Sequence, residues 1–162
     1  LALYLGRYAG FRIHECFRMD TAAAEQALRE NALTVKGKGG KVRIVPIEDE
    51  RILMMLRKLL AQTERGHKLL VPDGMPTDRA INALELFIYR CRNEIGDEGS
   101  DRRLTFHGLR HTYAAEKYTR LTEGGMSAID AHYAVSRLLG HERADVTNIY
   151  LASVRKRGRD GE

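Results

Sequence analysis

A short hairpin is the feature that most constrains how this chain can fold. Ala32–Lys36 and Val42–Ile47 have the composition of β-strands, and Leu33 and Val35 alternate with polar neighbours in the first. Between the two segments, the run Gly37-Lys-Gly-Gly40 supplies the backbone freedom that a tight turn requires. Proline has no N–H to donate to a strand ladder, so Pro46 indicates that the second strand lies at an edge or ends there.

Most of the remaining chain carries apolar residues at helical spacing. The clearest case is residues 49–63, where leucines and an isoleucine recur every three or four positions. Thr77, Thr105 and Ser127 are suited to cap helices, and Asp130 follows Ser127 at capping-box spacing. The predicted helices span 1–9, a stretch beginning near 13, 49–63, 77–91, 105–121, 127–140 and 145–157, with loops at 71–76 and 96–101. We therefore predict a mainly helical α+β fold, a helical bundle with a small antiparallel β-sheet on one side.

Composition narrows the possible functions. A chain of 162 residues is most naturally one domain. Its net charge of +5 and pI of about 9.4 suit a polyanionic partner. Cys16 and Cys91 are too few for a disulfide framework or a zinc site, which favours a reducing cytosol. The sequence contains no signal peptide and no long apolar run, so we expect a cytoplasmic location without membrane contact.

Tyr150 is the candidate nucleophile. A phenol has a pKa near 10, so only about one molecule in a thousand is ionised at pH 7. Such a group becomes a useful nucleophile beside a base or a group of cations. The alternative interpretation is a half-buried tyrosine on a helix, and the surrounding motifs have to decide between the two.

His107 and Arg110 are three positions apart and share one face of a helix. An arginine can donate two hydrogen bonds to a phosphate, and a histidine beside it can donate another or transfer a proton. Alternatively, Arg110 pairs with a carboxylate and His107 caps the helix. His107 and His111 also have metal-ligand spacing, but the zinc-protease pattern requires glutamate where Gly108 stands, so we expect no metal.

Three further positions carry candidate phosphate ligands. Arg12 precedes a predicted helix and can point into a cleft, or it pairs with Glu15, which would also orient it. His141 follows a glycine at a predicted helix end and is either a phosphate ligand or a surface histidine in a turn. The hairpin segment is rich in cations, namely Lys36, Lys38, Lys41 and Arg43. It is either a solvated hairpin tip or a basic hairpin that enters a DNA groove. A strand follows these cations rather than a helix, so a Walker loop is disfavoured.

Together these motifs resemble the tyrosine recombinase (phage integrase) family. The resemblance spans essentially the whole chain. It is most specific in the stretch from Thr105 to Thr112 and in the spacing from His141 to Tyr150. The stretches are Gly10-Phe-Arg-Ile-His-Glu15, Gly37-Lys-Gly-Gly-Lys-Val-Arg-Ile-Val-Pro46, Thr105-Phe-His-Gly-Leu-Arg-His-Thr112, Leu139-Gly-His141 and Ile149-Tyr150.

The resemblance implies a role for each matching residue. Arg12 and Arg110 would clamp the phosphate, and Tyr150 would attack it to form a 3′-phosphotyrosyl bond. Lys38 would protonate the 5′-oxygen that leaves, while His107 would act as acid or base. The remaining implied site residues are His141 as a donor, Glu15 and His111 as supports, and Lys36, Lys41 and Arg43 as DNA contacts. The family uses no metal and no other cofactor.

The resemblance also implies partners and a domain arrangement. Residues 1–162 would be the catalytic domain, and the DNA-clamping N-terminal domain usual in the family would be missing. The expected partners are double-stranded DNA, a homotetramer on paired sites and accessory DNA-bending proteins. The expected setting is the nucleoid of a bacterial or phage-host cell. The segment from Leu121 to Ser127 is longer than compact members require, which predicts an extended loop or helix there.

Three functions remain open at this level. The first is a site-specific recombinase or integrase of a mobile element. The second is a type IB topoisomerase or a hairpin-forming resolvase, which shares the same residue types but releases or rejoins strands differently. The third is a DNA-binding regulator with a degenerate site, although none of the expected catalytic residue types is missing from the sequence.

Overall fold

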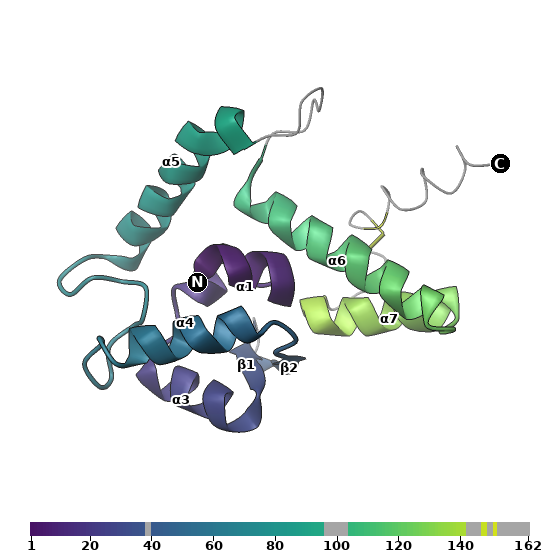
Figure 1. Ribbon diagram of the computed structural model, residues 1–162, viewed down its shortest axis with the longest axis horizontal. Helices are drawn as coiled ribbons and strands as arrows, with labels where there is room; N and C mark the ends of the chain where they lie inside the picture. The colour runs from purple at the N-terminus through teal and green to yellow at the C-terminus, as the bar shows by residue number, and fades with distance from the viewer. Residues whose placement is uncertain (38–39, 96–103, 142–146, 149–150, 152–162) are drawn as a thin grey trace.

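The chain folds into a group of helices with one small hairpin at their side (Figure 1). The computed structural model describes residues 1–37, 40–95, 104–141, 147–148 and 151. The helices are α1 (Ala2–Ala9), α2 (Ile13–Cys16), α3 (Thr21–Glu30), α4 (Glu50–Leu60), α5 (Thr77–Ile95), α6 (Phe106–Glu123) and α7 (Ala128–Leu139), and the strands are β1 (Ala32–Lys36) and β2 (Val42–Pro46). This architecture confirms the predicted mainly helical α+β class.

The two strands pair in an antiparallel register that runs from Ala32 opposite Pro46 to Lys36 opposite Val42. Because side chains alternate between the two faces, Leu33 and Val45 both point into the core, where they are buried. The same register puts Val35 opposite Arg43, so the arginine lies on the inward face. β2 ends at Pro46, which agrees with the expectation from the missing N–H.

Helix α1 ends where Gly10 adopts a left-handed conformation, with φ of 65°. The predicted helix over residues 1–9 is thereby confirmed, and so is its break near Gly10. Gly6 lets the helix approach α6 closely, because a Cβ at this position would lie 3.0 Å from the ring of Phe106. Figure 1 shows α1 beside the first half of α6.

The helical stretch predicted to begin near Ile13 is two helices rather than one. Helix α2 is a single turn, and a new helix, α3, starts after Asp20, whose carboxylate accepts a hydrogen bond of 2.8 Å from the backbone N–H of Ala23. Capping by this aspartate satisfies a backbone donor at the start of α3, which favours a fresh helix start at this point.

Two of the predicted caps are present. Thr105 caps α6 by accepting from the N–H of Gly108, and Ser127 caps α7 by accepting from the N–H of Asp130. Thr77 is instead the first residue of α5, and Lys68 donates a hydrogen bond to its hydroxyl. Helix α6 continues beyond Leu121 to Glu123, so part of the long segment before Ser127 is helix extension.

The apolar core has two parts. The larger one joins the inward faces of α1 to α5 and the hairpin to Phe106, and the smaller one lies between α6 and α7 and contains Tyr113, Ala114, Val135 and Leu139. Within the part of the chain that the structure describes, no helix is long and apolar enough to cross a bilayer.

The predicted loop at 96–101 lies outside the described residues. Of the predicted last helix, only residues 147–148 and 151 are described, and they are helical.

Substitution of Gly10 tests how tightly α1 is packed. We expect Gly10→Ala to lower the free energy of unfolding by about 3 kcal/mol, from left-handed strain and from overpacking. The added Cβ would meet Tyr113 Cδ1 at 2.5 Å and Leu139 Cδ2 at 3.1 Å. Gly74→Ala is the matched control, because its φ of 74° is similar and nothing lies within 4 Å of the added atom. Urea denaturation that gave both variants the same loss would contradict this packing.

Candidate active site

A cleft of about 270 Å³ opens where the junction of α1 and α2 meets the start of α6. Part of its wall is apolar and comes from Phe11, Ile13 and Phe106. The polar lining is Arg12, His14, Glu85, Thr105, His107 and Arg110. The sequence-predicted residues Arg12, His107 and Arg110 therefore meet in one concave site, although the first is nearly a hundred positions from the others.

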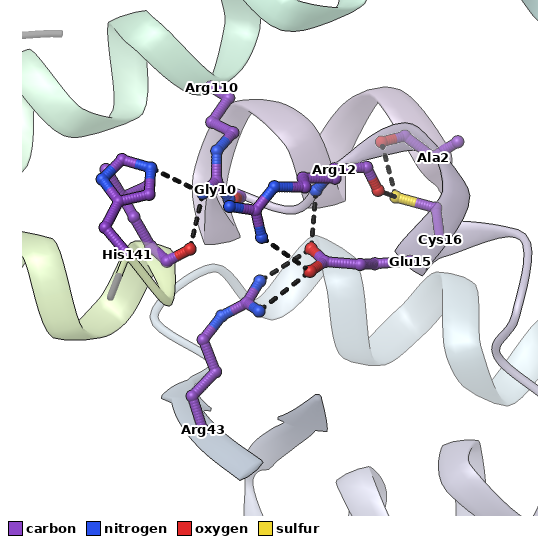
Figure 2. Close-up of polar contacts among 9 residues, drawn as sticks. Ala2, Gly10, Arg12, Glu15, Cys16, Arg43, Arg110 and His141 are labelled. Atoms are coloured by element: carbon purple, nitrogen blue, oxygen red, sulfur yellow. Dashed lines mark hydrogen bonds and ion pairs between the residues drawn. The ribbon is translucent and has the colours of Figure 1, made fainter. Parts of the chain in front are cut away.

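Arg110 lies at the back of this cleft with no exposed surface. Its guanidinium donates to two backbone carbonyls, those of Gly10 and Leu139, the second through Nη2 at 2.5 Å (Figure 2). Nη2 also lies 3.3 Å from Nε2 of His141. Backbone carbonyls, rather than a carboxylate, accept these two hydrogen bonds.

Those two carbonyls belong to the ends of two helices. Gly10 is the C-cap of α1, and Leu139 is the last residue of α7 before the C-cap Gly140. Carbonyl groups at helix C-termini lack partners within the helix and carry partial negative charge. They stabilise a guanidinium in the protein interior without a carboxylate, so the arginine keeps its positive charge for an anion in the cleft.

Arg12 and Glu15 form the pair that was one of the alternatives from the sequence. The Glu15 carboxylate accepts from the backbone N–H of Arg12 at 2.7 Å and from its Nη1 at 3.1 Å. One third of the Arg12 side chain is exposed, and the guanidinium lines the cleft. Glu15 therefore orients Arg12 toward the cleft without covering it.

The Glu15 carboxylate is almost completely buried yet ionised. Burial opposes its ionisation, but hydrogen bonds and charge from Arg43, together with the backbone and charge of Arg12, lower its pKa to about 2. Among the described residues Glu15 is the buried carboxylate, and it faces two arginines. The pair of cations outweighs it, so the site as a whole remains positive.

His141 is joined to the cleft through Arg110 and to the C-terminal segment through Thr147. Its Nδ1 lies 2.9 Å from the hydroxyl of Thr147, which is fully buried. Because an arginine only donates, Nε2 of His141 must accept from Arg110, and Nδ1 then carries the proton. Burial, and after it the charges of Arg110, Arg12 and Arg43, lower the pKa of His141 to about 4, so the ring is neutral near pH 7.

His107 lies at the mouth of the cleft, on the first turn of α6. Its ring meets that of His111 edge to face, with 4.8 Å between the centroids. Burial and the charges of Arg110 and Arg12 lower the pKa of His107, which favours the neutral form that can accept a proton. Thr105 caps the helix here, so the alternative in which His107 is the cap does not apply.

The predicted hairpin cations divide into two groups. Lys36 and Lys41 are exposed, as DNA contacts would have to be. Arg43 is not, because its side chain is 9% exposed and both its terminal nitrogens donate to Glu15. The register of β2 turns the Arg43 side chain inward, onto Glu15, whereas the sequence suggested an outward cation that contacts DNA.

Two of the predicted catalytic residues, Lys38 and Tyr150, lie outside the described residues. In the described part of the chain, no group of three or more His, Cys, Asp or Glu residues is placed to hold a metal ion. Sequence reasoning missed the partner of His141, Thr147, and the two carbonyls that hold Arg110. A backbone carbonyl has no residue type that could signal it, and a lone threonine is too common to do so.

Comparison with known proteins places this arrangement in a family. A model of the phage integrase family matches residues 1–157. The tyrosine recombinase XerD of Pseudomonas putida is 29% identical over 130 residues, which cover 76% of this chain and 39% of that protein. XerD of Lacticaseibacillus casei is 32% identical over 125 residues, covering 76% of this chain and 40% of that protein.

The fold agrees with that match. The crystal structure of XerA recombinase superposes with a TM-score of 0.63 at 21% identity, covering 98% of this chain and 56% of that one. The Tn1549 transposon integrase, solved in complex with circular intermediate DNA, gives a TM-score of 0.65 at 16% identity and covers 99% of this chain and 59% of that one. The chain belongs to the phage integrase family, which confirms the resemblance to tyrosine recombinase catalytic domains. It spans about two-fifths of the length of the XerD relatives.

The depressed pKa of Glu15 predicts an acid-dependent loss of stability. The folded value of about 2 lies below the ordinary 4.5, so the stabilisation of about 3 kcal/mol is complete above pH 4.5 and lost as the pH falls toward 2. We expect Glu15→Gln to be less stable at pH 7 and to lack this part of the pH dependence. Urea denaturation between pH 7 and pH 3 measures it, with the exposed Glu64→Gln as control. Parallel curves for wild type and Glu15→Gln would contradict the assignment.

Proposed function

We propose that residues 1–162 form the catalytic domain of a site-specific DNA recombinase that cleaves and rejoins strands through a 3′-phosphotyrosyl intermediate. The observation that carries the proposal is the convergence of Arg12, His107 and Arg110 on one cleft, with His141 in contact with Arg110. Membership of a family whose relatives are tyrosine recombinases supports the same conclusion.

The cleft suits a phosphodiester in the transition state of displacement. Negative charge then accumulates on the non-bridging oxygens, and preorganised cations stabilise it most when they do not have to reorganise. Arg110 is held by backbone carbonyls and Arg12 by Glu15, so both guanidiniums are in place before the substrate arrives. We assign them as the phosphate clamp.

The histidines complete the electrostatics. His107 is neutral and would accept the phenolic proton of Tyr150 as the oxygen attacks phosphorus. The His141 ring accepts from Arg110 in this structure. Burial is the main cause of the low pKa of His141, and the arginine charges add to it; an anion in the cleft would offset those charges and favour a second proton on Nε2, which could then donate to a non-bridging oxygen.

The covalent step follows from these assignments. The Tyr150 oxygen forms a bond to phosphorus while the bond to the 5′-oxygen breaks, and Lys38 donates a proton to that oxygen. The 5′-hydroxyl of a partner strand reverses the step, returning a proton and releasing the tyrosine. The phosphotyrosyl ester conserves the energy of the broken bond, so rejoining requires no nucleotide cofactor. The roles of Tyr150 and Lys38 rest on their positions in the family motifs.

The proposed substrate is double-stranded DNA, and the proposed setting is a mobile element carried in the nucleoid of a bacterial or phage-host cell. The net charge of +5 and the exposed Lys36 and Lys41 beside the hairpin turn favour backbone contacts to DNA. A homotetramer on paired sites and accessory DNA-bending proteins are part of the same proposal. A transposon integrase among the structural relatives supports the assignment to a mobile element.

The first test of this function is covalent trapping. Full-length protein and Tyr150→Phe would be mixed with a nicked suicide duplex built from the ends of the element, then denatured in SDS. We expect a covalent DNA adduct in wild type and none in Tyr150→Phe, because only the phenol supplies the attacking oxygen, while DNA affinity stays nearly unchanged. Tyr133→Phe, an exposed tyrosine on α7, is the control and should form adduct normally. Equal adduct from Tyr150→Phe would rule out this nucleophile.

Substitution of Arg12 and of Arg110 should affect cleavage similarly but protein stability differently. We expect Arg12→Lys and Arg110→Lys each to slow cleavage about 100- to 1,000-fold, the usual cost of losing one stabilising donor. Arg12 is partly exposed, so its variant should unfold at nearly the wild-type temperature. Arg110→Lys leaves buried carbonyls unpaired and should lose about 2 kcal/mol or more. Single-turnover cleavage and thermal denaturation measure both effects, and equal destabilisation would contradict the different burial.

A further inference from the structure

Arg43 is turned into the protein, and only 9% of its side chain is exposed. Its side chain crosses from β2 to the single turn of α2, where Nη1 donates to Glu15 Oε1 at 2.9 Å and Nη2 donates to Oε2 at 2.7 Å. Parallel bonds of this kind between guanidinium and carboxylate fix direction as well as distance. Within the described part of the chain, the remaining nitrogen, Nε, is buried without a hydrogen-bond partner, so the hydrogen bonds of this guanidinium all go to Glu15.

Glu15 shares its carboxylate between two arginines with different surroundings. Arg43 is 9% exposed and ends at the carboxylate, whereas Arg12 is 33% exposed and continues into the cleft. Figure 2 shows the carboxylate between the two guanidiniums. The bond from Arg12 Nη1 is also the longer, at 3.1 Å, so Arg43 is the tighter anchor and Arg12 the ligand that it helps to hold.

Arg43 also packs against two segments that carry other candidate site residues. A Cβ added at Gly140 would lie 3.0 Å from both Cδ and Nη1 of Arg43, so the glycine before His141 leaves room for this side chain. On the opposite side, the guanidinium lies 5.7 Å from the centroid of the Phe11 ring, next to Arg12 in the chain. One buried side chain from the hairpin therefore touches the segments that carry Arg12 and His141.

We infer that Arg43 is a positioning residue: through Glu15 it holds the Arg12 guanidinium in the cleft, and it does not contact DNA. The inference rests on the proposed function for its effect on catalysis and on geometry alone for its effect on Arg12. The inference also means that the register of β2 determines whether Arg43 reaches Glu15. A slip of one residue would turn Arg43 outward and present Ile44 to Glu15, so strand register and cleft geometry are coupled.

The catalytic test is a double-mutant cycle on full-length protein with a nicked suicide duplex at saturating concentration. We expect Arg43→Gln to slow single-turnover cleavage about 100-fold, as a displaced positioning group does. Combined with Arg12→Lys, it should slow cleavage little further than Arg12→Lys alone, because both changes remove one function. Strictly multiplicative effects would show that Arg43 acts independently of Arg12 and would overturn the inference.

The binding test separates positioning from DNA contact. Each lost phosphate contact lowers the slope of log affinity against log salt by about 0.9. We expect Arg43→Gln to keep the wild-type slope, and the exposed hairpin cation Lys36→Gln to lower it. A lower slope for Arg43→Gln with an unchanged cleavage rate would assign Arg43 to DNA binding instead.

A third readout needs no catalysis. In ¹⁵N NMR spectra, the Nε–H signal of Arg12 should broaden or vanish in Arg43→Gln and persist in Arg57→Gln, an exposed arginine on α4. An unchanged Arg12 signal in Arg43→Gln overturns the inference. The absence of a covalent adduct, in contrast, would contradict the proposed function but not the positioning of Arg12 by Arg43. If Arg43→Gln does not fold, as judged by thermal denaturation, Arg43→Lys replaces it in all three tests, because lysine keeps the charge but loses the paired donors.

Discussion

The guanidinium of Arg110 joins the C-terminal ends of two helices inside the protein, and the cleft is built around that contact. Its donors reach the carbonyl at the C-cap of α1 and the last carbonyl of α7. A buried charge is costly unless it is fully hydrogen-bonded, so the two helix ends and the start of α6 are held together. Gly10 and Gly140 end those helices in left-handed conformations. Fold stability and site geometry thus depend on the same side chain.

Around this contact, positively charged side chains outnumber negatively charged ones. Arg12, Arg43 and Arg110 surround a site in which Glu15 is the buried carboxylate of the described residues. The nearby histidines are kept neutral by burial and by the same arginines. The excess of positive charge is therefore carried by groups that do not titrate near neutral pH. Such a site favours an anion over a neutral or cationic ligand across a wide pH range.

The sequence predicted the hairpin, most helix boundaries and the convergence of Arg12, His107 and Arg110, because these depend on local periodicity and on motif order. It did not reveal that Arg43 turns inward, because the basic composition of the hairpin drew more attention than its alternation, which places Arg43 on the same face as Val45. The break before α3 was missed although Asp20 is a good helix cap. The carbonyls of Gly10 and Leu139 could not be predicted, since a long-range contact to backbone leaves no residue type to recognise.

The most direct test of the account is a crystal structure of full-length protein on a nicked suicide duplex. We expect that structure to show the scissile phosphate in the cleft, within hydrogen-bond distance of the Arg12 and Arg110 guanidiniums. Nε2 of His141 should face a non-bridging oxygen of the phosphate. The Glu15 carboxylate should still lie between Arg12 and Arg43, with no DNA atom against Arg43. A phosphate bound elsewhere, or an Arg110 that leaves the helix ends to reach it, would contradict a cleft assembled before the substrate binds.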